Sequence, residues 1–159
     1  FAKAGDFAGG KPELWVAIVE KAYAKQAGGY DEIEGGWSKD VLPMITGQRN
    51  IVHDPEDLSF GELSESFKKG SAITLESRDK GKDVLWWHLG DDPMHDNSLY
   101  KNGTLIPNHT YYVVGVDEVN KTVIVKNPWG WGKNPTQAIP FSDVQGAFRE
   151  IVTNDGTRK

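Results

Sequence analysis

The sequence predicts an α+β fold, in which a few helices flank an antiparallel β-sheet. Three observations support this prediction. Apolar residues recur at helical spacing over residues 14–22. Ser59 and Glu62 have the spacing of a helix capping box. Residues 111–116 and 122–125 are rich in aromatic and β-branched side chains and are joined by turn residues, which predicts a β-hairpin.

The size and composition of the chain are typical of one globular domain. It has 159 residues, of which 38% are hydrophobic and 26% are charged. The net charge of −5 and the lack of a basic block argue against a nucleic-acid partner. No apolar run approaches the roughly 18 residues of a membrane span, so we expect no membrane partner. Because the chain starts at Phe1 rather than at a methionine, we expect a fragment or a processed chain.

Two helices are predicted in the first third of the chain. The first begins with Pro12, whose missing N–H is tolerated in a first helical turn, and ends at Gly28. The second is capped by Ser38 or Asp40, runs to about Ile45 and is ended by Gly47. We expect Pro43 near the first turn of this helix, because a proline in a helix interior costs about 3 kcal/mol.

The remaining predicted elements are helices and strands in alternation. A third helix starts at Asp57 or Ser59 and closes at Gly70, and residues 71–75 have the composition of a strand. Beyond the hairpin we predict a short helix over 143–146 and a strand over 148–152. These strands and the hairpin together make the predicted sheet.

The predicted hairpin brings an imidazole close to a carboxamide. If its turn centres near Glu118, His109 lies directly opposite Asn127, and a turn one or two residues later leaves them near neighbours. An amide oxygen beside a histidine fixes the ring orientation and the tautomer, so that the neutral ring can take a proton from a nucleophile. Cysteine peptidases of the papain type use such a Cys-His-Asn arrangement. The alternative is a surface hairpin on which the His and the Asn are incidental.

Two blocks of the sequence resemble the calpain family of papain-like cysteine peptidases. The first block comprises residues 109–117 and the Asn-Pro-Trp-Gly sequence at 127–130, and the second comprises Leu-Trp at 14–15, residues 20–25 and Gly-Gly at 35–36. The blocks follow the order of the family, so the resemblance spans roughly residues 13–152. It implies a papain-like half-domain at 13–153, a lead or linker from the other half at 1–12, and a tail at 154–159.

The resemblance implies a role for three residues of the hairpin. His109 would be the general base and then the general acid, Asn127 would orient its ring, and Trp129 would shield the hydrogen bond between them. In calpains the nucleophilic cysteine lies on a helix in the first half of the protease core, before the block that corresponds to Leu14 and Trp15. The present sequence contains no cysteine, so the nucleophile is not in this chain.

The expected function is therefore that of the His/Asn-bearing half of a calpain-like cysteine endopeptidase. It would hydrolyse peptide bonds only together with a Cys-bearing half, and the 159 residues alone would be inactive. The expected partners are that Cys-bearing half and a protein or peptide substrate. One alternative is a non-catalytic pseudoprotease module that binds a protein partner through the same cleft. Another is a different Cys-His-Asn hydrolase or acyl transferase on the same fold.

Residues 78–107 are polar and show no clear element, so we predict a loop that gates the cleft. Four side chains within this loop are candidate metal ligands, because carboxylates and an imidazole can bind divalent cations. They are Asp91, Asp92, His95 and Asp96. Clustered acids in a solvated loop are the commoner case, so we expect no metal site there.

Calcium activation is not expected either. Calpains usually carry acidic calcium ligands in the loop after Asn-Pro-Trp-Gly, whereas this chain has Lys133 and Asn134 there and no acid before Asp143. The departure from the family pattern argues against calcium binding, and we expect no cofactor.

Three N-x-Thr sequences bear on the cellular setting. They begin at Asn102, Asn108 and Asn120. A glycan on Asn108 would stand beside His109 and obstruct the cleft. We therefore favour a cytoplasmic or bacterial origin over a glycosylated secreted protein.

Overall fold

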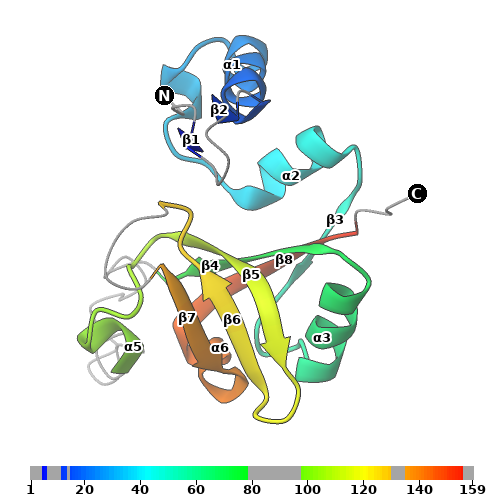
Figure 1. Ribbon diagram of the computed structural model, residues 1–159, viewed down its shortest axis with the longest axis vertical. Coiled ribbons are helices and arrows are strands. Elements are labelled where there is room, and N and C mark those ends of the chain that lie inside the picture. The colour runs from blue at the N-terminus through cyan, green and yellow to red at the C-terminus, as the bar shows by residue number, and fades with distance from the viewer. Residues whose placement is uncertain (1–4, 7–11, 14, 79–97, 130–134, 156–159) are drawn as a thin grey trace, which may run out of the picture. The chain divides into compact units, whose positions relative to one another are not determined.

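The computed structural model describes residues 5–6, 12–13, 15–78, 98–129 and 135–155 (Figure 1). The chain divides into two compact units, residues 1–41 and residues 42–159. The predicted domain over 13–153 contains parts of both units. Among the described residues, no helix has both the length and the apolar character needed to cross a bilayer.

The first unit contains a small two-stranded sheet, a long α-helix and a short 3-10 helix. The strands β1 (Gly5–Asp6) and β2 (Pro12–Glu13) pair antiparallel, and α1 (Trp15–Ala27) and the 3-10 helix η1 (Asp31–Ile33) follow. The prediction that Pro12 lies in the first helical turn is wrong, because Pro12 is in β2. A proline is tolerated in such a strand, where its missing N–H can face away from the partner.

The end of α1 agrees with the prediction. Gly28 and Gly29 both donate their N–H to the carbonyl of Ala24, over 3.1 and 2.9 Å. Gly28 has a φ of 108°, a conformation that glycine adopts without the cost that a Cβ would impose. The predicted helix stop at Gly28 is therefore confirmed.

The helix α2 (Ser38–Thr46) crosses the boundary between the two units. Pro43 lies inside this helix, so the prediction that it sits near the first turn is wrong. The helix begins at Ser38 and ends where Gly47, with a φ of 69°, donates its N–H to the carbonyl of Pro43 over 2.8 Å. A proline within so short a helix removes one intrahelical donor.

The second unit contains a six-stranded sheet in which all neighbouring strands are antiparallel (Figure 1). The strand order is β3-β8-β4-β5-β6-β7, so the central strands come from distant parts of the sequence. The strands are β3 (Asn50–His53), β4 (Ala72–Ser77), β5 (Thr110–Asp117), β6 (Thr122–Lys126), β7 (Thr136–Pro140) and β8 (Phe148–Asn154). The predicted α+β class is confirmed.

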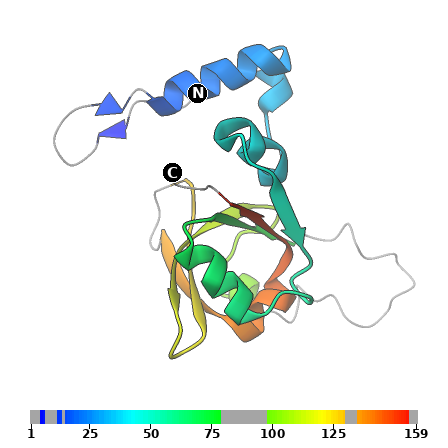
Figure 2. The same ribbon diagram turned by 90° about the vertical axis from the view of Figure 1, so that its right-hand side faces the viewer.

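Helices α3 (Phe60–Lys68) and α6 (Phe141–Ala147) pack on this sheet (Figure 2). The predicted capping box of α3 is confirmed, since Ser59 Oγ accepts from the N–H of Glu62 and the Glu62 carboxylate accepts from the N–H of Ser59. Both helices contribute to one core with the inward side chains of the strands. The largest fully buried apolar members are Leu63, Leu75, Tyr111, Val123, Val125, Ile139, Val144, Phe148 and Ile151.

The segment predicted to be a structureless loop is partly ordered into a helix. The helix α5 (Ser98–Lys101) lies within this segment, and Leu105, which follows α5 in the sequence, is part of the core. Tyr100 donates its hydroxyl to the carbonyl of Ala147, and burial raises the pKa of Tyr100, so this hydroxyl stays protonated near neutral pH. The other part of the predicted gating loop, residues 79–97, lies outside the described residues.

Candidate active site

His109 and Asn127 meet at one end of the β5–β6 hairpin. His109 immediately precedes β5 and Asn127 immediately follows β6. The Nε2 atom of His109 lies 2.9 Å from Oδ1 of Asn127, which is a good hydrogen-bonding distance. Both side chains are partly buried. The predicted juxtaposition of these two residues is confirmed.

The register of the hairpin differs from the one expected. Val113 pairs with Val125, but Gly115 pairs with Ile124, so Val114 forms a β-bulge. In this register Asn127 continues the ladder opposite Tyr111 rather than opposite His109. The His–Asn pair is therefore diagonal, and it still shares one face because side chains alternate with a period of two.

The tautomer of His109 follows from the backbone around Asn127. The Trp129 N–H donates to Asn127 Oδ1 over 3.0 Å. A backbone N–H can only donate, so the atom that faces both Trp129 and His109 must be the amide oxygen. Nε2 of His109 must then carry a proton, so in the neutral ring Nδ1 is the nitrogen with the free lone pair. The site presents an imidazole ready to accept a proton at Nδ1.

Aromatic rings flank the imidazole. The ring centroids of His109 and Trp129 are 4.4 Å apart with an interplanar angle of 55°. Tyr111 meets the imidazole edge to face, with centroids 5.1 Å apart. The hydroxyl of Tyr111 accepts from the N–H of Ile106 over 2.8 Å, and burial raises the pKa of this tyrosine. The His–Asn hydrogen bond thus has apolar neighbours that reduce competition from water.

A residue that the sequence did not single out holds the backbone of His109. Ser77, the last residue of β4, donates its N–H to the carbonyl of His109 over 2.9 Å. Its Oγ accepts from the N–H of His109 over 2.8 Å. No local sequence signal identifies Ser77, because the contact joins two residues that are 32 positions apart.

The candidate metal ligands lie in segments that the structure does not describe. Asp91, Asp92, His95 and Asp96 lie outside the described residues, as do Lys133 and Asn134 of the loop after Asn-Pro-Trp-Gly. Within the described ranges, no group of three or more His, Asp or Glu side chains is placed to hold a metal ion.

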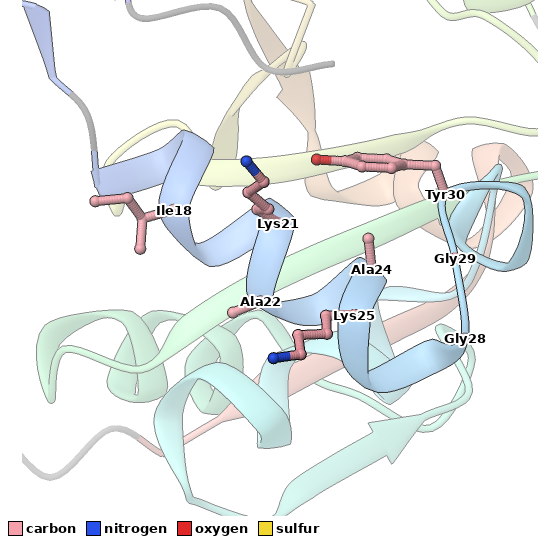
Figure 3. A pocket seen from close by; sticks show the side chains of 8 residues that line it. All are labelled: Ile18, Lys21, Ala22, Ala24, Lys25, Gly28, Gly29 and Tyr30. Carbon is pink, nitrogen blue, oxygen red and sulfur yellow. The ribbon is translucent and has the colours of Figure 1, made fainter.

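The first unit contains a hollow of about 600 Å3 beside α1 (Figure 3). Its wall is formed by α1 residues and by the turn at Gly28, Gly29 and Tyr30, with Lys21 and Lys25 as the charged members. It includes none of the residues predicted to carry chemistry.

The His–Asn pair on an α+β fold has the form used by the Cys-His-Asn class of cysteine proteases. A sequence model of the family described as "Calpain family cysteine protease" matches residues 7–155. The chain belongs to the calpain family of cysteine proteases.

Several curated proteins of this family are similar to the chain. Calpain-9 of Mus musculus is 32% identical over 161 residues, which cover 92% of this chain and 20% of that protein. The calpain-type cysteine protease DEK1 of Arabidopsis thaliana is 32% identical over 120 residues, covering 74% of this chain and 5% of that protein. Calpain-7 of Homo sapiens is 30% identical over 133 residues, which cover 77% of this chain and 14% of that protein. The chain thus spans a fifth or less of the length of these relatives.

Proposed function

We propose that the chain is the His/Asn-bearing half of the protease core of a calpain-like cysteine endopeptidase. The observation that carries this proposal is the hydrogen bond between His109 Nε2 and Asn127 Oδ1, with Oδ1 fixed by the Trp129 N–H. Together these contacts leave Nδ1 of His109 as the proton acceptor. Membership of the calpain family supports a peptidase role and a protein or peptide substrate.

The proposed mechanism uses a cysteine from a segment outside these 159 residues. Nδ1 of His109 takes the proton of the cysteine thiol, and the resulting thiolate attacks the carbonyl carbon of the scissile peptide bond. The imidazolium then returns the proton to the leaving amine. The C–N bond breaks and leaves the acyl group on the cysteine as a thioester. In the second half of the cycle, Nδ1 takes a proton from water, the hydroxide attacks the thioester carbonyl, and the imidazolium returns the proton to the departing thiolate.

Asn127 and Trp129 would support His109 without exchanging protons with the substrate. The neutral amide of Asn127 orients the ring and accepts a hydrogen bond from Nε2–H throughout, which suits a thiolate–imidazolium pair whose charges already balance. The indole of Trp129, 4.4 Å from the imidazole between ring centroids, would keep water from competing for that bond.

The test is peptide hydrolysis by the full-length protein that contains this chain. His109→Ala should lower kcat/KM by roughly 10²–10⁴-fold, which is the usual contribution of a general base. His53→Ala is the matched control. His53 lies on β3 at the sheet edge and contacts Thr153 Oγ1 over 3.0 Å, so its loss should leave kcat/KM unchanged.

The same measurement separates the proposal from its alternative. Full activity in the His109→Ala protein, or no activity in a full-length protein that has the cysteine, would contradict the endopeptidase proposal. The second result, combined with tight binding of a protein partner, would instead identify a non-catalytic module.

A further inference from the structure

Ser77 is buried at the point where β4 meets the histidine of the site. Its side chain has 0% relative exposure. At this residue the pairing of β4 with β8 shifts register, so that Glu76 faces Glu150 while Ser77 faces Phe148. Ser77 therefore lies at an irregularity of the central strand, beneath the segment that leads into β5.

The peptide groups of Ser77 and His109 are joined in both directions. The Ser77 N–H donates to the His109 carbonyl over 2.9 Å, and the His109 N–H donates to Ser77 Oγ over 2.8 Å. The hydroxyl has one proton of its own, and Oγ lies 2.7 Å from the carbonyl oxygen of Ile106 and 2.9 Å from that of His109. One buried side chain thus binds the chain at His109 and three residues before it.

Asn108, one of the two residues between these contacts, is under conformational strain. Asn108 has a φ of 51°, in the left-handed region that residues with a Cβ adopt rarely. Its N–H donates to the Arg78 carbonyl over 2.9 Å, and its Oδ1 accepts from Nη2 of Arg149 over 3.0 Å. A strained residue persists only where its surroundings hold it, and here the holding groups include the residue next to Ser77.

The position of the imidazole depends on this backbone. The His109 side chain reaches Asn127 across a diagonal, with 2.9 Å between Nε2 and Oδ1. Small displacements of a reacting group have large effects on rate, since a misplacement of about 1 Å costs on the order of 10²-fold. A group that holds both the N–H and the carbonyl of His109 therefore fixes the backbone from which its ring extends.

We propose that Ser77 is a positioning residue for His109: its hydroxyl holds the His109 peptide so that Nε2 stays on Asn127 and Nδ1 stays free. Ser77 acts through the backbone and does not touch the substrate. The consequence for catalysis depends on the proposed peptidase function, whereas the consequence for the His109 tautomer does not.

The test compares Ser77→Ala with wild type in this chain by nitrogen NMR of the imidazoles and by amide hydrogen exchange. The chain has four histidines, and the His109 signals are those lost in His109→Ala. In wild type, His109 should be protonated at Nε2. In Ser77→Ala it should become a mixture of both tautomers, and its amide should exchange about tenfold faster, as expected when a hydrogen-bond acceptor is removed.

Ser71→Ala is the matched control. Ser71 is also buried and precedes the other end of β4, where its Oγ donates to Oδ1 of Asp155 over 2.7 Å. Its loss should leave the His109 signals as in wild type. The proposal is overturned if Ser77→Ala folds without changing the His109 tautomer and exchange, or if Ser71→Ala changes them equally.

A second variant covers the case in which Ser77→Ala does not fold. Cysteine is close in size to serine and replaces the hydroxyl by a weak acceptor. Ser77→Cys should therefore also give a mixture of His109 tautomers and faster exchange of the His109 amide. Unchanged signals in a folded Ser77→Cys chain would equally overturn the proposal.

Kinetics of the full-length protein separate this inference from the proposed function. Ser77→Ala should lower kcat about tenfold or more and leave KM nearly unchanged, because a buried hydroxyl contributes no substrate contact. If the NMR changes occur and the full-length protein hydrolyses no peptide, the endopeptidase proposal fails and the role of Ser77 stands. If peptide hydrolysis is found without NMR changes in Ser77→Ala, the role of Ser77 fails alone.

Discussion

Oδ1 of Asn127 lies 2.9 Å from Nε2 of His109, and the same oxygen accepts the N–H of Trp129 over 3.0 Å. A single amide oxygen therefore receives two donors, one from a side chain and one from the backbone. The backbone donor fixes the orientation of the amide, and the amide fixes the tautomer of the histidine. A substitution at Trp129 that keeps the backbone N–H should therefore leave the Asn127 amide in place, whereas a substitution at Asn127 should change the tautomer of His109.

Asn127→Ala should remove the acceptor that selects the Nε2–H tautomer of His109. We expect a mixture of tautomers in the imidazole NMR spectrum of this chain. In the full-length protein kcat should fall by less than the roughly 10²–10⁴-fold that loss of the general base itself would cost. Asn120→Ala is the control, since Asn120 lies in the hairpin turn and donates to Asp117 Oδ2 over 2.7 Å. Equal effects of both variants would contradict the role given to Asn127.

Trp129→Ala should impair the site without unfolding the chain. Trp129 is 56% exposed, so its truncation should change the free energy of unfolding by about 0.5 kcal/mol or less. The backbone N–H that holds Asn127 remains, while the ring that covers the imidazole is lost. We expect a lower kcat in the full-length protein and faster solvent exchange of the His109 Nε2–H. Trp129→Phe should retain most of both properties, and a large loss of stability in Trp129→Ala would show that the ring is structural.

The 159-residue chain alone should hydrolyse neither casein nor fluorogenic peptides. It contains no cysteine, and a serine or threonine would need a base within reach in a shaped site to replace it. Residual turnover that survives His109→Ala would come from a contaminating protease. Turnover abolished by His109→Ala would show that another residue of this chain is a nucleophile.

Calcium should not raise the melting temperature of the chain. A ligand that binds only the native state must increase its stability, and the sequence after Asn-Pro-Trp-Gly offers Lys133 and Asn134 rather than acids. Thermal denaturation with calcium or with a chelator should give the same midpoint. A clear upward shift with calcium would direct attention to the acids at 91–96.

Acid should remove the stabilisation that Glu118 provides at the hairpin turn. The Lys68 ammonium, 2.5 Å away, and the Ser64 hydroxyl hold the pKa of Glu118 below its ordinary value of 4.5. A lowered native pKa means that the stabilisation is present above about pH 4.5 and is lost as the pH falls through the native value.

The measurement is the free energy of unfolding of wild type and Glu118→Gln between pH 3 and pH 7, where about pH 4 marks the region of carboxylate titration. The two proteins should differ near neutral pH and converge in acid. Lys68→Met should reduce the pH dependence in the same way, and a difference that persists unchanged at the lowest pH would contradict the ion-pair origin.

The sequence predicted those parts of the fold whose signals are local. The hairpin has two strong β runs around turn residues, and Ser59 and Glu62 form their capping box within one helical turn. The juxtaposition of His109 and Asn127 followed from the hairpin, because any nearby register keeps them close.

The sequence did not predict the strands β3 and β7, because these strands are stabilised by pairing with neighbouring strands rather than by a local pattern. In β7, only Ile139 is buried, so the strand has no apolar alternation strong enough to be recognised. In β3, Ile51 and Val52 are exposed and the strand is set by its pairing with β8. Ser77 was missed for a related reason: its partners lie in another strand, and a serine at a strand end has no distinctive local pattern.

The bulge at Val114 restricts how the hairpin can change in length. Val113 and Val116 both pack against the core although they are three positions apart, and residues at an odd spacing face opposite sides of a regular strand. Val114 is the extra residue of the bulge, and it lets Val113 and Val116 face the same side of the sheet. Deleting one residue from the bulge would turn either Val116 or His109 to the opposite face. Insertions and deletions should therefore be tolerated in the turn at 118–121. Within β5, two residues must be inserted or deleted together so that side chains keep their faces, or a single deletion must remove the bulge.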